Sequence, residues 1–110
     1  MLFNKNEWAT IIIDNKASNY QVSKRGFVRK IGENILCEPI YDSIRDCYYI
    51  SIVIFDVVYT KALDAIVLDA FSFNREEDKV VVRHLDGCSS NNDLDNLVWT
   101  RFNPRIIRRT

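Results

Sequence analysis

The first third of the chain alternates apolar and polar positions with the two-residue period of β-strands. An apolar segment at residues 8–13 precedes a polar, turn-like stretch at 14–19, and residues 20–23 alternate again. Residues 24–26 contain a glycine and favour a turn, after which 27–29 form the expected returning strand. The pattern therefore predicts a β-hairpin near the start of the fold.

Shorter apolar pieces follow at residues 35–36 and 40–41, and both are predicted to be short strands. Residues 48–59 are rich in Ile, Val, Tyr and Phe, the composition that a strand prefers. The aromatic side chains of this region are expected to pack in the core or across strands rather than to stack on nucleic-acid bases.

The period of the pattern changes after residue 60. Apolar residues then recur at spacings of three and four, as on one face of an amphipathic helix: Leu63, Ile66, Val67, Ala70 and Phe71. Thr60 is the predicted N-cap of this helix. Asp64 and Asp69 are expected on its solvated face, and a charged loop is expected at residues 74–79.

The last part of the chain combines two short apolar segments with a polar loop. The pattern predicts a strand at residues 80–84, a loop rich in Asp, Gly, Ser and Asn at 85–96, and a second strand at 97–99. Residues 100–110 are rich in arginine and are predicted to form a basic helix, with Pro104 in its first turn.

These elements predict an α+β fold in a single domain over residues 1–110, with a β-rich region at 1–59 and a second region at 60–110. The chain has 110 residues, of which 47% are hydrophobic, so it can bury a core. No apolar run is long enough to cross a bilayer, and the N-terminus lacks the pattern of a signal peptide. Three cysteines without a CxxC pair favour a reduced, intracellular protein, and no membrane partner is expected.

Charge is unevenly distributed, although the net charge is zero. Basic residues concentrate at the two ends of the chain, and the middle is acidic. If the ends meet in the fold, they form a basic face suited to nucleic acid. The alternative is an ordinary mixed surface. The candidate nucleic-acid-binding residues are Lys24, Arg25, Arg29, Arg83, Arg101, Arg105, Arg108 and Arg109.

One sequence motif is more specific than these patterns. Residues 82–87 are Val-Arg-His-Leu-Asp-Gly, an Asn pair stands at 91–92, and residues 96–99 are Asn-Leu-Val-Trp. This order closely resembles the core of HNH homing endonucleases, where a strand ends in Asp-His and is followed by hydrophobic-Asp-Gly, Asn-Asn and Asn-Leu-x-Trp.

The resemblance extends upstream of this core. Trp8, followed by Tyr-Gln-Val-Ser-x-x-Gly-Phe-Val-Arg at residues 20–29, is similar to the small modular domain that often precedes the nuclease core. The predicted helix ends in Ala-Phe at 70–71, as the family's helix does before the catalytic strand. The resemblance therefore covers the chain from Trp8 to Thr100.

This resemblance implies a ββα-metal fold, also called a His-Me finger, at the C-terminus: a hairpin and a helix around one Mg²⁺ or Mn²⁺ ion. It implies that His84 is the general base that activates water and that Asn96 holds the loop and orients the histidine. Asp86, Gly87 and the Asn pair match the family's loop, and Trp99 matches a core residue.

The metal ligands depart from the family pattern. The family's ligand Asp is Arg83 here, and a guanidinium has no lone pair to offer a metal. The second ligand should fall near Arg105, where Asn103 is the nearest substitute. In the upstream helix, Asp64 and Ala65 replace the family's His-Arg pair. No residue is therefore assigned as a metal ligand, and no cofactor is expected unless the protein is active.

Three functions remain open. The first is a catalytically degenerate HNH-endonuclease-like protein that binds nucleic acid, DNA rather than RNA, or serves as a structural subunit. By analogy with the mobile elements of this family, its expected source is a phage or a virus. The second is an active endonuclease that nicks DNA with Mg²⁺ or Mn²⁺, using Asp86, Asn103 or backbone as ligands. The third is a subunit that binds only a protein partner in a larger assembly.

Individual residues also have two interpretations each. His84 is either a retained base or a structural remnant that holds the hairpin by hydrogen bonds. Arg83 either contacts phosphate or pairs with Asp86 or Asp95. The basic turn at 24–30 either enters a duplex groove or is a solvated hairpin, and the arginines after Trp99 either bind backbone phosphates or form a basic tail.

Overall fold

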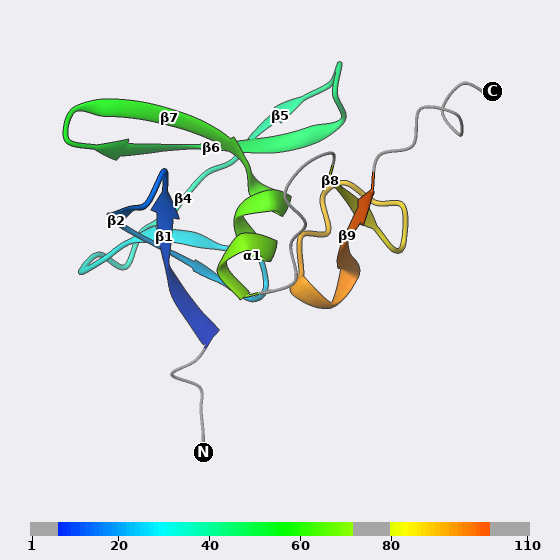
Figure 1. The fold of residues 1–110 in the computed structure, drawn as a ribbon. Helices are drawn as coiled ribbons and strands as arrows, with labels where there is room; N and C mark the ends of the chain where they lie inside the picture. Colours follow the sequence, from blue (N-terminus) through cyan, green and yellow to red (C-terminus); the bar gives the residue numbers. More distant parts are fainter. Residues whose placement is uncertain (1–6, 72–79, 102–110) are drawn as a thin grey trace.

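The computed structural model describes residues 7–71 and 80–101, and within them it forms an α+β fold of three small sheets around one α-helix (Figure 1). In chain order the elements are β1 (Trp8–Ile13), β2 (Lys16–Ser23), β3 (Val28–Lys30), β4 (Leu36–Cys37), β5 (Ile40–Asp42), β6 (Cys47–Ile54), β7 (Val57–Ala62), α1 (Leu63–Phe71), β8 (Val80–His84), the 3₁₀ helix η2 (Leu94–Asn96) and β9 (Leu97–Arg101). The predicted fold class is confirmed for this part of the chain.

The N-terminal sheet contains β1, β2, β3 and β4, each antiparallel to the next. Asp14 and Asn15 alone form the turn between β1 and β2, with φ of 51° and 65°. The turn predicted at 14–19 is therefore too long, because Asp and Asn adopt left-handed backbone at little cost and close the hairpin in two residues. The predicted hairpin, with its turn at 24–26, is confirmed by β2 and β3.

The middle sheet contains β5, β6 and β7. The apolar stretch at 48–59 lies in two strands rather than one, because Phe55 and Asp56 form a turn with φ of 50° and 66°. The sequence hides this turn, since a large apolar residue seldom has positive φ. Thr60 lies within β7, where its hydroxyl is 3.3 Å from that of Ser51, so its prediction as the helix N-cap is wrong.

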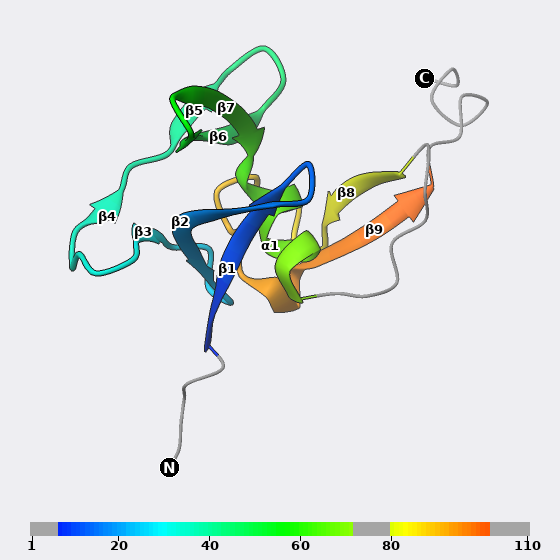
Figure 2. The same cartoon turned by 60° about the vertical axis from the view of Figure 1, so that its left-hand side comes forward.

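The helix predicted at 63–71 is confirmed as α1. Figures 1 and 2 show α1 in the middle of the molecule, with the β1–β4 sheet on one side and the β8–β9 hairpin on the other. The core includes residues from all three sheets, and its most deeply buried side chains are Val22, Val28, Ile52 and Val67. Each such burial contributes about 1.5–3 kcal/mol to folding.

The C-terminal hairpin pairs β8 with β9, as predicted. Thr100 and Arg101 belong to β9, opposite Val81 and Val80, so a helix does not begin at residue 100. The rest of that predicted helix lies outside the described residues, as does the loop predicted at 74–79. No helix in residues 7–71 and 80–101 is long and apolar enough to span a membrane.

Candidate functional site

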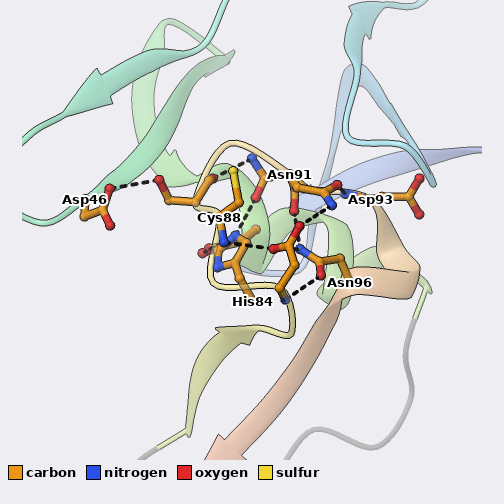
Figure 3. Close-up of polar contacts among 10 residues, drawn as sticks. Asp46, His84, Cys88, Asn91, Asp93 and Asn96 are labelled. Carbon is orange, nitrogen blue, oxygen red and sulfur yellow. Dashed lines mark hydrogen bonds and ion pairs between the residues drawn. The ribbon is translucent and has the colours of Figure 1, made fainter.

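The loop between β8 and β9 is held by the side chains of Asp86, Asn91 and Asn96 (Figure 3). One Asp86 oxygen accepts hydrogen bonds from the Cys88 backbone N–H (2.8 Å) and from Asn96 Nδ2 (2.9 Å), and the other accepts from Asn91 Nδ2 (2.9 Å). Asn96 Oδ1 accepts in turn from the Asp86 N–H at 3.0 Å. The bonds from Asn91, from the Cys88 backbone and from Asn96 lower the pKa of Asp86. These bonds therefore stabilise the loop when the Asp86 carboxyl is ionised.

His84 ends β8 and points into the site beneath this loop. Its Nε2 lies 3.0 Å from Asn92 Oδ1 and 3.9 Å from Asp64 Oδ2, and the His84 side chain is only 12% exposed. Asn92 is oriented by a second bond, from its Nδ2 to the Ser89 carbonyl (3.4 Å). In the tautomer in which Nε2 donates to this Asn92 oxygen, the lone pair of the neutral imidazole is on Nδ1.

The structure divides between two residues the roles that the resemblance gives to one. Asn96 holds the loop, through Asp86 and through the Asn91 carbonyl that its Nδ2 meets at 2.9 Å. The side chain that contacts His84 is Asn92, whose position in the Asn pair had indicated only a loop role. Both Asn side chains are buried, and buried amides are rigid when all their bonds are made.

Asp64 also belongs to the site, contrary to the expected solvated position on the helix. It lies in the first turn of α1, and its side chain is 13% exposed. Burial raises the pKa of Asp64, although the Ala65 backbone N–H and His84 oppose the shift. Apolar periodicity could not reveal this, but the family's His-Arg pair aligns with Asp64 and Ala65 and was a signal for this position.

We expect Asp64→Asn to stabilise the protein more at pH 8 than at pH 4. A raised folded pKa means that the ionised carboxyl is penalised in the fold, and this penalty grows as pH rises above the unfolded pKa, about 3.9. Urea unfolding across this pH range measures the difference. Asp95→Asn, at an exposed position, is the control; a gain independent of pH would contradict the assignment.

Two residues that the sequence did not single out connect the middle sheet to the same loop. Asp46, in the turn between β5 and β6, accepts hydrogen bonds from Ser89 Oγ (2.8 Å) and from the Tyr41 hydroxyl (2.7 Å). Figure 3 shows Asp46 with its bond to the loop. The bonds from Tyr41 and Ser89 lower the pKa of Asp46. Asp46 and Ser89 are 43 residues apart, so no local pattern could have paired them.

The predicted basic residues fall into four groups. Lys24 and Arg25 are exposed in the turn between β2 and β3, and this turn lies against the loop: the Leu94 N–H donates to the Lys24 carbonyl at 2.7 Å. Arg83 is exposed on β8, and in the described part of the chain it forms no ion pair with Asp86 or Asp95. The basic turn between β2 and β3 therefore lies against this loop, and the basic segment that follows Arg101 lies outside the described residues.

Arg29 is held differently from these exposed cations. Its guanidinium lies 3.7 Å from the ring centre of Trp8, and its Nε donates to Gln21 Oε1 at 3.1 Å. Stacking of this kind fixes the plane of the guanidinium while leaving its outer N–H groups available. Arg101 is the last described residue, and Arg105, Arg108 and Arg109 lie outside the described residues.

The donors of this site do not fit the divalent ion that the resemblance implies. Among the residues that the structure describes, no three His, Cys, Asp or Glu side chains are grouped as ligands. Arg83 places a cation where the family has a carboxylate. Asp86, the substitute considered from the sequence, already accepts three hydrogen bonds from loop donors, which use three of its roughly four acceptor positions.

Comparison with known proteins supports the fold. A solved structure described as DNA binding and cleavage by the HNH homing endonuclease I-HmuI superimposes with a TM-score of 0.76 and 27% sequence identity over 92% of this chain. The fold is HNH-like. This chain spans 55% of the I-HmuI chain, about half of its length. No family model matches the sequence, and no curated protein matches it.

Proposed function

We propose that this chain is an HNH-endonuclease-like protein that binds DNA without cutting it. The single observation that carries the proposal is Arg83, a cation that stands where the family has a metal-ligand carboxylate, in an otherwise HNH-like fold. His84, the next residue, is held by Asn92 through Nε2 and lies beside Asp64. The neighbouring Arg83 offers N–H donors that suit phosphate oxygens, as the family's ligand carboxylate does not.

The DNA-binding surface of this proposal consists of the exposed turn residues Lys24 and Arg25, the stacked Arg29 and the exposed Arg83, with the arginines that follow Trp99 as its extension. Support comes from the position of the turn against the loop and from the likeness to I-HmuI, a DNA-binding endonuclease. The proposal treats residues 1–110 as one intracellular domain. A phage or viral origin and a role in a larger protein assembly stay predictions.

The test is a gel with supercoiled plasmid and Mg²⁺ or Mn²⁺, on which nicking and band shift are read together. We expect a shift that weakens with salt, and no nicking. Arg83→Ala should reduce the slope of log affinity against log salt by about 1, since one phosphate contact is lost. Arg45→Ala should leave that slope unchanged, because Arg45 is already paired with Asp42 at 3.3 Å.

An active endonuclease is the second candidate function. It is favoured by one observation: the loop that positions His84 keeps a complete set of bonds among Asp86, Asn91 and Asn96. Nicking that disappears in His84→Ala would establish this activity and overturn the proposal. A gel that shows no nicking and no band shift would also overturn the proposal. That result would favour a protein-binding subunit.

A further inference from the structure

A pocket of about 520 Å³ lies where the first two sheets, the start of α1 and the loop between β8 and β9 meet. We name it the junction pocket. It lies between the β2–β3 turn, the connection from β4 to β5, the start of β6 and the loop before η2. Its volume is in the range of small-molecule sites. The lining residues that matter here are Arg25, Phe27, Leu36, Glu38, Tyr48 and Asp93.

The walls of the junction pocket are fixed in place. Gly26 lies so close to the loop that a Cβ there would be 2.8 Å from the Asn92 carbonyl oxygen. The Leu94 N–H bond to Lys24 joins the same two segments. Asn92 lines the pocket and also bonds His84, so the pocket is one residue away from the histidine. A site with rigid walls loses little entropy when it binds.

The lining combines planar apolar surface with unused polar groups. Phe27 and Leu36 are 50% and 52% exposed, and the partly buried Tyr48 lies in the same lining. The Arg25 guanidinium and the Glu38 carboxylate have no side-chain partner in residues 7–71 and 80–101. Asp93 adds a second carboxylate, one oxygen of which accepts from the Asp95 N–H at 3.1 Å.

We propose that the junction pocket binds a single nucleotide displaced from a DNA strand, and that it prefers a base with an exocyclic amino group. An aromatic and aliphatic lining stacks on any base, at about 1–3 kcal/mol per base. Carboxylate oxygens only accept hydrogen bonds, so Glu38 and Asp93 select the exocyclic amino group of guanine, cytosine or adenine over thymine. Arg25 supplies the donor for the nucleotide's phosphate.

This inference rests on the proposed function, since it names the part of the DNA that the HNH-like site holds. The two carboxylates argue against a site for phosphate alone, because they would repel it. They also argue against a purely apolar ligand, because burying them without donors is costly. A nucleotide satisfies the cation, the acceptors and the flat apolar surface together.

The test is titration of the full chain with deoxyguanosine monophosphate, followed by amide NMR shifts. We expect millimolar binding that moves the signals of Gly26, Asn91 and Asn92, and no such movement with deoxyribose 5-phosphate. Phe27→Ala should weaken the binding about tenfold, as expected for one lost stacking contact. Phe55→Ala is the matched control, because Phe55 is an 85% exposed ring in a turn that does not line the pocket.

Glu38→Gln tests the preference without removing apolar surface. It should weaken deoxyguanosine monophosphate several-fold and leave thymidine monophosphate unchanged. Nucleotide binding in the junction pocket would be overturned by either of two results. One is NMR shifts with deoxyribose 5-phosphate that equal those with deoxyguanosine monophosphate, and the other is no NMR shift near the pocket with either compound. If plasmid binding is intact in that case, the proposed function survives. If the protein binds the nucleotide in the pocket but does not retard the plasmid on the gel, nucleotide binding is supported and the proposed function is overturned.

Discussion

Gly26→Ala should lower the free energy of unfolding by about 3 kcal/mol or more, the largest effect of any glycine substitution in the described chain. Gly26 has φ of 90°, in the left-handed region where a side chain costs about 1–3 kcal/mol. The added methyl would also lie 2.8 Å from the Asn92 carbonyl oxygen and 3.0 Å from its Cβ. Neither neighbour can move without disturbing the contact with His84, so the crowding adds a further cost.

The chain provides a matched control for this prediction. Gly32 has nearly the same φ, 89°, but no atom lies within 4 Å of the position of its added Cβ. Gly32→Ala therefore measures the backbone cost alone, about 1–2 kcal/mol. Urea unfolding monitored by tryptophan fluorescence compares the two variants. Equal losses would show that the β2–β3 turn does not depend on close packing against the loop.

This packing explains how much of the fold the sequence could predict. Period-two and period-3.6 patterns located the strands around Tyr20 and Val82 and the helix from Leu63, because those patterns record which side chains face the core. The turn at Phe55 was missed, since its conformation contradicts the preference of its own residue. Thr60 has the chemistry of an N-cap, but pairing with β6 keeps it in a strand.

The candidate site was predicted to a similar extent and for a similar reason. His84 and Asn96 could be named from the sequence because the HNH-like motif is local, and their catalytic roles stay predictions. Asp64, Asp46 and the β2–β3 turn reach the same loop from other elements, and their contacts depend on how the sheets pack around α1. Even Asn92, inside the motif, gained its contact with His84 only from the fold of the loop.

Asn96→Asp should be more destabilising than Asn96→Ala, although it is nearly isosteric. Asn96→Ala leaves the Asp86 N–H and the Asn91 carbonyl without these partners in a part-buried site, which costs about 1–3 kcal/mol. Asn96→Asp restores an acceptor for that N–H but removes both donated bonds. It also places a second carboxylate where the amide now meets the Asp86 oxygen at 2.9 Å, and the two like charges repel each other at pH 7.

The pH dependence separates repulsion from lost packing. Asp86 raises the pKa of the introduced carboxyl, so its destabilising effect is present above the unfolded pKa of about 3.9 and is lost as pH falls. A protonated carboxyl can donate one hydrogen bond to Asp86. The free energy of unfolding of Asn96→Asp should therefore approach that of Asn96→Ala as the pH falls from 7 to 4. Asn19→Asp, at an exposed position on β2, should change stability by less than about 0.5 kcal/mol. If the difference in free energy of unfolding between Asn96→Asp and Asn96→Ala does not change with pH, the loop has rearranged so that the new carboxyl lies away from Asp86. The bonds that hold His84 in place would then depend on Asn92 alone.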